Sequence, residues 1–213
     1  MDIVVLLFDR ITALDAVGPY EVLARLPGAR VRFVARQAGP VRTDDRFLAL
    51  VADDALDAVT RADVLVVPGG LGTRALEHDA GVLAWVRAIH ETTTWTTSVC
   101  TGSLVLGAAG LVRGLEATTH WAVLERLAEH GAVPVRRRVV EQGKILTAAG
   151  VSAGIDMALH LAARIGGPEL AQAIQLGIEY DPAPPFDSGS VDKAPPAIVA
   201  AVRTALAART RGG

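Results

Sequence analysis

The sequence contains a single cysteine, Cys100, among its 213 residues. One cysteine can form neither an internal disulfide nor a multi-cysteine zinc site, which excludes a secreted disulfide scaffold. The formal net charge is only −2, so the chain lacks the strongly basic surface of proteins that bind nucleic acid non-specifically. The N-terminus has no basic segment, and its apolar run is too short to span a membrane. We therefore expect a cytoplasmic protein whose partners include neither nucleic acid nor a membrane.

Hydrophobic residues, by contrast, make up 51% of the chain and charged residues only 21%, which supplies a large buried core. The length predicts a single domain over residues 1–213. Short apolar runs alternate with helical patterns, which predicts an α/β sandwich around a mostly parallel sheet. Strands are expected at Ile3–Phe8, Val31–Ala35, Val64–Val67, Thr94–Val99, Arg136–Glu141 and Ile145–Ala148. Helices are expected at Tyr20–Leu26, Gly81–Glu91, Gly102–Leu111, Trp121–His130, Ala153–Ile165, Glu169–Glu179 and Ala197–Arg209, with a frayed end at Gly212–Gly213.

The predicted strands also indicate where a site would lie. In open α/β sheets, ligands bind beyond the carboxyl ends of the strands. Three loops meet that criterion: the loop after Phe8, the loop after Val67 and the turn at Cys100. Candidate functional residues are therefore sought in these loops.

Cys100 directly follows a predicted β-branched strand, and small residues follow it, beginning with Gly102 and Ser103. A nucleophile on a sharp strand-to-helix turn needs small neighbours because the backbone is crowded there. The pattern is therefore typical of a nucleophile elbow, with sulfur in place of the serine oxygen. The N–H groups of the new helix would stabilise a thiolate or a developing anion on a substrate. The alternative is an inert, buried cysteine that closes a strand.

A cysteine nucleophile needs a base or proton carrier. Asp15 is a candidate because its neighbours are apolar, and desolvation would raise its pKa and allow proton exchange near neutral pH. Its alternative role is that of an N-cap for the following helix. Among the histidines, none directly follows Cys100, where Thr101 stands. His120 suits the start of a helix near the surface, and His160 suits the packed face of an apolar helix.

The run Pro68–Gly72 is a glycine-rich loop that follows a predicted strand. Such a loop brings backbone N–H groups close to a ligand. This one lacks both the Walker lysine and the dinucleotide spacing of phosphate-binding loops. An oxyanion-binding loop opposite Cys100 fits the pattern better, and a plain strand-to-helix turn is the alternative.

In this combination the sequence resembles the DJ-1/PfpI superfamily, and within it a bacterial branch that hydrates isocyanides. The resemblance rests on the strand-end acid Asp15, the Pro68–Gly70 loop and the cysteine elbow. It implies a flavodoxin-like three-layer sandwich, a homodimer with sites near the subunit interface, and catalysis without a metal or an organic cofactor. The matching runs, which cover most of the chain in order, are LDAVGPYEVLARLP, VPGGLGTRAL, TSVCTGSLVLGAAGLV, ATTHWAVL, GVSAGIDMALHLAA and QLGIEYDPAPPFDSGS.

The same resemblance implies a role for each site residue. Cys100 would be the nucleophile and Asp15 the general acid and base, and the substrate would be a small isocyanide, hydrated to an N-formamide through a covalent thioimidate. Gly70 and Thr101, with Gly69 beside them, would bind the substrate or its oxyanion. Thr101 stands where the protease-like branch has a histidine, which argues against an intracellular peptidase.

Two other functions would use the same thiol. One is a glyoxalase-type hydratase or deglycase that acts on 2-oxoaldehydes; an aspartate rather than a glutamate beside the thiol argues against it. The other is a redox-sensing module in which Cys100 is oxidised. The roles of two further segments stay open. Arg136–Arg138 is either a ligand patch or a solvated face. Tyr180–Phe186 either forms a wall of the site or makes a packing or dimer contact.

Overall fold

Residues 1–211 are described by a computed structural model, in which the chain forms two compact units. The first unit, Met1–Ile178, holds every strand of the described chain. The second unit, Glu179–Gly213, contains an irregular stretch followed by helix α7 (Pro196–Arg211), close to its predicted bounds. The predicted frayed end, Gly212–Gly213, lies outside the described residues.

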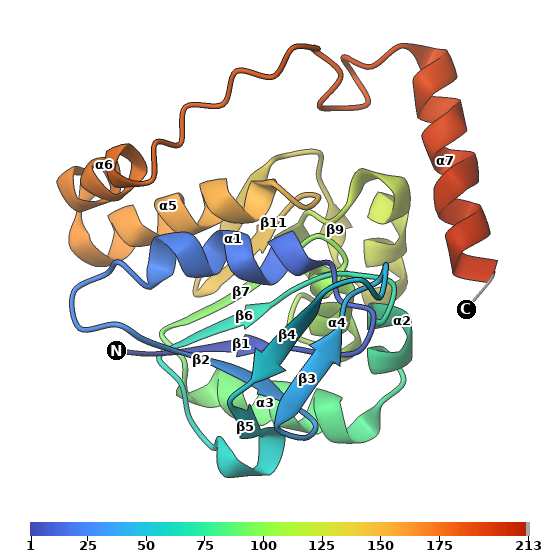
Figure 1. Ribbon diagram of the computed structural model, residues 1–213. Helices are drawn as coiled ribbons and strands as arrows, with labels where there is room; N and C mark the ends of the chain where they lie inside the picture. Colours follow the sequence, from blue (N-terminus) through green and yellow to red (C-terminus); the bar gives the residue numbers. More distant parts are fainter. Residues whose placement is uncertain (212–213) are drawn as a thin grey trace. The chain divides into compact units, whose positions relative to one another are not determined.

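A seven-stranded sheet forms the centre of the first unit (Figure 1). Its strands are β1 (Asp2–Leu6), β2 (Arg30–Ala35), β5 (Asp54–Ala55), β6 (Val64–Val67), β7 (Trp95–Val99), β10 (Val139–Gln142) and β11 (Ile145–Ala148). The strand order is β10-β11-β7-β6-β1-β2-β5, and every neighbouring pair is parallel except β10–β11. Within this sheet, β2-β1-β6-β7-β11 follow the 2-1-3-4-5 order of flavodoxin-like folds.

Helices cover both faces of this sheet (Figure 1). Helices α1 (Ala13–Leu23) and α5 (Ala153–Gly166) pack together over one face, and α3 (Ala80–Thr92) and α4 (Gly102–Ala108) lie over the other. The predicted three-layer α/β sandwich with a mostly parallel sheet is therefore confirmed. The smaller elements are β3 (Gly39–Arg42), β4 (Ala49–Ala52), η1 (Leu56–Ala58), α2 (Thr73–Leu76), β8 (Glu116–Ala117), η2 (Trp121–His130), β9 (Val133–Pro134) and α6 (Pro168–Gly177).

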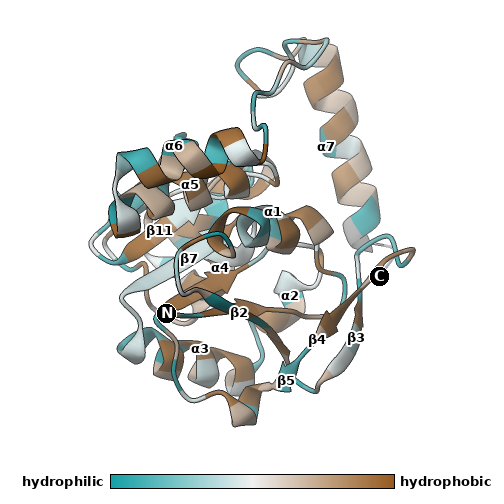
Figure 2. Cartoon of the chain, turned by 60° about the vertical axis from the view of Figure 1, so that its left-hand side comes forward, coloured by the Kyte–Doolittle hydropathy of each residue, from teal (hydrophilic) through white to brown (hydrophobic). Residues whose placement is uncertain are grey.

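The central strands are apolar on both faces because helices cover both faces. All residues of Ile3–Val5 and Val64–Val67 are 0% exposed. The helices are amphipathic: α3 buries Val82 and Val86 on one face, and its N-cap Asp79 accepts two backbone N–H groups. Figure 2 shows hydrophobic colour over much of the sheet and hydrophilic colour at β2 and β5, while α3 and α5 combine both colours. The sequence pattern therefore identified these elements because burial determines their composition.

Helix α1 begins earlier than the sequence predicts. The sequence pattern places Gly18-Pro19 before a helix that starts at Tyr20, but both residues lie inside α1. Pro19 supplies no N–H for the carbonyl of Asp15, yet the helix continues through it. Gly18 serves packing, because a Cβ there would lie 3.1 Å from the Ile155 side chain of α5. Close contact between the two helices, rather than helix initiation, accounts for this glycine.

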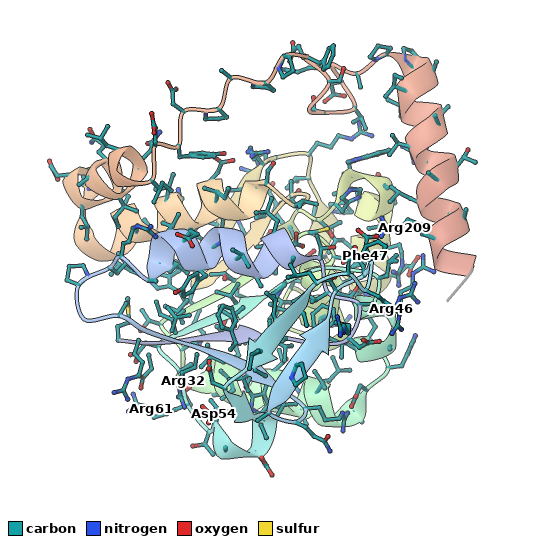
Figure 3. The ribbon with its side chains drawn as sticks, viewed as in Figure 1. Arg32, Arg46, Phe47, Asp54, Arg61 and Arg209 are labelled. Atoms are coloured by element: carbon teal, nitrogen blue, oxygen red, sulfur yellow. The ribbon has the colours of Figure 1, made fainter. Side chains whose placement is uncertain are left out.

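An ion pair links β2 to β5 near one edge of the sheet (Figure 3). Arg32 Nη1 of β2 lies 3.2 Å from Asp54 Oδ2 of β5. The edge strand β5 itself is only two residues long. A short, charged edge strand offers little backbone for pairing with another chain. Among residues 1–211, no helix combines the length and the apolar character needed to cross a membrane.

The buried sheet predicts which leucines stabilise the fold. Leu65, at the centre of β6, is 0% exposed, and we expect Leu65→Ala to lower the free energy of unfolding by about 2–5 kcal/mol because it leaves a cavity. Leu176→Ala, at a leucine that is 82% exposed, should change that free energy by less than about 0.5 kcal/mol. Urea unfolding followed by circular dichroism measures both. Equal losses in the two variants would contradict this assignment of the core.

Candidate active site

The three predicted loops meet at the carboxyl ends of β1, β6 and β7. The strand order reverses between β1 and β6, which is where open α/β sheets bind ligands. Ile11 pairs with Gly70 in an isolated bridge, and the Thr12 N–H donates to the Gly69 carbonyl at 2.9 Å. The Gly70 N–H donates to Thr101 Oγ1 in the third loop at 3.0 Å. The three segments therefore form one hydrogen-bonded unit.

Cys100 occupies the sharp turn between β7 and α4. Its φ is +55°, a left-handed conformation that is unfavourable for a residue other than glycine. Its N–H donates to the carbonyls of Ala148 and Ala149 at 3.1 and 3.0 Å. Its own carbonyl accepts the hydroxyls of Ser103 and Thr119 at 3.2 and 2.7 Å. Bonds from three neighbouring segments therefore hold the strained turn that a nucleophile elbow requires.

Two glycines let the backbone segments of the site approach one another. A Cβ on Gly102 would lie 2.0 Å from the Val67 carbonyl oxygen, which accounts for the glycine that follows the cysteine turn. A Cβ on Gly69 would lie 2.8 Å from both Asp15 Oδ2 and Cys100 Cβ. The carboxylate and the cysteine therefore approach each other beside Gly69, where only a hydrogen atom fits.

The Asp15 side chain is buried beside the cysteine. Its Oδ2 accepts the Gly69 N–H at 2.9 Å, and its Oδ1 accepts no hydrogen bond from the described residues. Burial raises the pKa of Asp15 to about 7; the Gly69 N–H and the Cys100 thiol oppose this rise, and the Asp44 carboxylate adds to it. The N-cap alternative is wrong, because Thr12 is the N-cap and Asp15 is the third residue of α1. Asp15 is thus a buried acid that titrates near neutral pH.

The Cys100 thiol lies in the same buried environment. Burial, and then the negative charge of Asp15, raise the pKa of the thiol well above its usual range. The backbone N–H groups of Val151 and Thr101, and the Thr101 hydroxyl, act in the opposite direction. The thiol is therefore protonated near neutral pH, and the N–H groups beside the sulfur favour its thiolate form.

Comparison with known proteins decides the family. The DJ-1/PfpI family model matches residues 1–164. The chain belongs to the DJ-1/PfpI family. The isonitrile hydratase of Pseudomonas putida is 48% identical over 194 residues, which are 91% of this chain and 85% of that protein. The HTH-type transcriptional regulator CdhR of Pseudomonas aeruginosa is 30% identical over 161 residues, which are 74% of this chain but only 47% of the regulator.

Solved structures show the same DJ-1/PfpI fold. The crystal structure of a ThiJ/PfpI family protein from Pseudomonas syringae matches with a TM-score of 0.94 and 39% identity, over 99% of this chain and 87% of that one. The DJ-1beta structure from Drosophila melanogaster matches with a TM-score of 0.75 at 23% identity, over 84% and 97% of the two chains. The flavodoxin-like sandwich is therefore shared with distant relatives.

The glycine N–H groups of this DJ-1/PfpI site are already bonded within the protein. The sequence predicts that Gly69, Gly70 and Thr101 bind the substrate or its oxyanion. In the structure, the Gly69 N–H orients Asp15, and the Gly70 N–H donates to Thr101 Oγ1, which donates back to the Gly70 carbonyl at 3.2 Å. The N–H groups that act on the sulfur are those of Thr101 and Val151. The two glycines thus position the acid and the threonine.

Sequence reasoning missed Val151 and Thr119. Val151 has a φ of +37°, an outlier for a β-branched residue, and lies just after β11. The strand order supplies the missing signal: β11 is parallel to β7, so its carboxyl end must lie beside Cys100. A sequence without known strand order gives no means of choosing that loop. Among residues 1–211, no group of three or more His, Cys, Asp or Glu side chains is arranged to hold a metal ion.

His120 and His160 differ in burial. His120 caps the start of η2, as predicted, with Nδ1 accepting the Ala122 N–H at 3.3 Å. It is partly buried rather than near the surface, and burial lowers the pKa of its ring. The prediction that His160 is packed is wrong: its side chain is 44% exposed and lies 2.6 Å from Glu141, because it stands on the outer face of α5.

The arginine run is partly explained by surface ion pairs. Arg137 pairs with Glu116, and Arg138 pairs with Asp156 and bonds to Ser152. Both arginine side chains are at least half exposed. These two residues therefore form a solvated, ion-paired face.

The crowding at the elbow predicts a severe effect of one methyl group. Gly102→Ala places a Cβ 2.0 Å from a backbone oxygen of β6, so we expect a loss of about 3 kcal/mol or more in the free energy of unfolding. Gly177→Ala is the control, because a Cβ there has nothing within 4 Å and should leave stability unchanged or slightly raised. Thermal and urea unfolding measure both variants. A Gly102→Ala protein of native stability would show that the elbow is not packed as described.

The raised pKa of Asp15 makes stability depend on pH. Since that pKa is about 7 in the folded protein and 3.8 ordinarily, the folded state holds this proton more tightly than the unfolded chain. The associated stability is complete below about pH 4 and is lost as the pH rises towards 7, by on the order of 4 kcal/mol at most. Asp15→Asn should therefore gain stability relative to the wild type over that range. Urea unfolding at a series of pH values measures this; a constant difference between the two proteins would contradict it.

Proposed function

We propose that the protein hydrates isocyanides to N-formamides by covalent catalysis, with Cys100 as nucleophile and Asp15 as general acid and base. One observation carries the proposal: a buried carboxyl with a pKa of about 7 lies beside the thiol. The 48% identity to the isonitrile hydratase of Pseudomonas putida, over 91% of this chain, supports the choice of substrate. Neither a metal nor an organic cofactor takes part in the proposed reaction.

The first step joins the substrate to the cysteine. Asp15, in its ionised form, accepts the proton of the Cys100 thiol as the sulfur attacks the terminal carbon of R–N≡C. Asp15 then delivers that proton to the same carbon. One C–S bond and one C–H bond form, the carbon–nitrogen triple bond becomes a double bond, and the product is a thioimidate. The N–H groups of Thr101 and Val151 stabilise the negative charge on sulfur during the attack.

The second step consumes one water molecule. Asp15 accepts a proton from the water as its oxygen adds to the thioimidate carbon, and the nitrogen takes up this proton. The tetrahedral intermediate then collapses: a carbon–oxygen double bond forms, the C–S bond breaks with its electron pair on sulfur, and the hydroxyl proton returns to the thiol through Asp15. The product is the N-formamide, and the site regains its starting protonation.

The environment of Asp15 suits it to both steps. A group that must accept and donate protons in one cycle works best when its pKa lies near the operating pH. Burial supplies this shift, while the Gly69 N–H at 2.9 Å fixes one carboxylate oxygen and leaves the other for proton transfer. A solvated aspartate with an ordinary pKa would be too weak a base to take the proton of a buried thiol.

Two substitutions test the assigned roles. Cys100→Ala should abolish isocyanide turnover, and Asp15→Asn should lower kcat by roughly 10²- to 10⁴-fold, because it removes general acid–base catalysis. Glu21→Gln is a matched control, since Glu21 is a carboxylate of the same helix whose side chain is 48% exposed. Formation of the N-formamide from an aryl isocyanide measures all three. Full turnover by Cys100→Ala would overturn the covalent mechanism.

The same assay separates the alternative functions. The wild type should turn over an isocyanide with a higher kcat/KM than methylglyoxal; the opposite order would favour a glyoxalase-type enzyme.

Light scattering tests the homodimer that the family resemblance implies. Intact mass after peroxide treatment shows whether Cys100 is oxidised, as a redox-sensing module requires.

A further inference from the structure

An ion cluster around one buried carboxylate lies outside the groups that the proposed reaction uses. Glu77, the C-cap residue of α2, has a side chain that is only 3% exposed. Its Oε2 and Oε1 accept Arg126 Nη2 and Nη1 at 2.6 and 3.3 Å, and His130 Nε2 lies 3.3 Å from Oε2. Desolvation of such charges largely offsets their attraction, so a buried ion pair adds little stability over apolar packing of the same volume. Stability alone therefore does not account for the Glu77 cluster.

The carboxylate and the arginine both stand in segments that begin at the site. Glu77 lies seven residues after Gly70, whose N–H bonds to Thr101 Oγ1. Arg126 lies seven residues after Thr119, whose hydroxyl holds the carbonyl of Cys100 at 2.7 Å. The bidentate pair thus ties the glycine loop to the turn that supports the elbow.

The histidine connects the same cluster to the elbow helix. Gly107 of α4 lies seven residues after Cys100, and a Cβ on Gly107 would lie 2.7 Å from His130 Cγ. Glycine inside a helix is unfavourable, so the close contact with the imidazole accounts for its presence. Glu77, at the end of α2, is therefore linked to η2 through Arg126 and His130, and to α4 through the contact of His130 with Gly107. Each of these three segments follows a part of the site.

We propose that Glu77, Arg126 and His130 are positioning residues that hold the Gly69–Gly70 loop, the Cys100 elbow and the Thr119 turn in register. The kinetic consequence rests on the proposed hydration reaction. A displacement of about 1 Å between a nucleophile and its proton carrier lowers rates by up to two orders of magnitude. Loss of the cluster should therefore reduce kcat while leaving KM nearly unchanged.

The chain offers a control cluster with the same three residue types, although Arg126 also lies 3.6 Å from Glu129. Glu141 lies 2.6 Å from His160 Nε2 and 3.2 Å from Arg164 Nη2. Its side chain is 27% exposed, and it joins β10 to the second half of α5, the helix that begins two residues after Val151, rather than to the segments that carry Gly70, Cys100 and Thr119. Glu77→Gln and Glu141→Gln thus make the same chemical change in two clusters that differ in burial and in what they connect.

The comparison uses kinetics and hydrogen exchange on the full chain. Glu77→Gln should lower kcat roughly 10- to 100-fold with KM within about threefold of wild type. Peptides covering residues 68–72 and 118–121 should exchange their amide hydrogens faster. Glu141→Gln should leave kcat and these exchange rates within about twofold of wild type. If Glu77→Gln behaves like Glu141→Gln in both measurements, the cluster does not position the site.

A double variant separates positioning from stability. Glu77→Gln leaves Arg126 without its buried partner, which destabilises the fold, whereas Glu77→Gln with Arg126→Met removes both charges and should restore the thermal midpoint towards wild type. Positioning predicts that kcat stays low and that the two loops still exchange fast in this double variant. Recovery of kcat together with stability would overturn the proposal. If the wild type hydrates no isocyanide, the proposed function fails, and hydrogen exchange alone decides the role of the cluster.

Discussion

The site depends on the absence of a side chain at Gly69. A single Cβ there would lie within 2.8 Å of both Asp15 Oδ2 and Cys100 Cβ. Because a glycine fits at this position, its N–H lies 2.9 Å from Asp15 Oδ2. The loop that contains Gly69 covers Asp15, which is 0% exposed. That burial is the largest cause of the raised pKa of Asp15. Backbone packing at one position thus sets the chemistry of the acid, and with it the proton balance of the thiol.

The first unit buries two carboxylates, Asp15 and Glu77, and their electrostatic surroundings are opposite. Glu77 has a guanidinium at 2.6 Å and an imidazole at 3.3 Å, so its charge is matched by neighbours. Asp15 has the Asp44 carboxylate and the Cys100 thiol near it, and it forms no ion pair with a cation of the described residues. A buried acid without a cation holds its proton more tightly, and its pKa rises. Desolvation acts on both carboxylates, but it leaves an ion-paired cluster around Glu77 and an acid with a raised pKa at Asp15.

The parts of the molecule that a sequence can predict are those that burial dictates. Val64–Val67 and Ile3–Val5 are continuous apolar runs because helices cover both faces of the sheet, and their strands agree closely with expectation. The start of α1 was missed because Gly18 serves a contact with Ile155, which no local pattern reveals. Val151 was missed for a related reason: its place beside the sulfur follows from strand order, which pairs β11 with β7. Local composition predicts elements, whereas contacts between elements require the fold.

Strain at the elbow explains why the site needs support from several segments. Cys100 and Val151 both have positive φ, and each such residue costs on the order of 1–3 kcal/mol. A strained conformation persists only where the surroundings hold it, and the bonds that hold Cys100 come from the loop after β11 and from Thr119, besides the first turn of α4. If any of these hydrogen-bonding segments moved, the backbone of Cys100 would relax from its strained conformation. The rigidity of the elbow is therefore a property of the packed segments around it. The Glu77 cluster joins two of them, the Thr119 segment and α4, to the glycine loop, and so acts where the stored strain makes the geometry most sensitive.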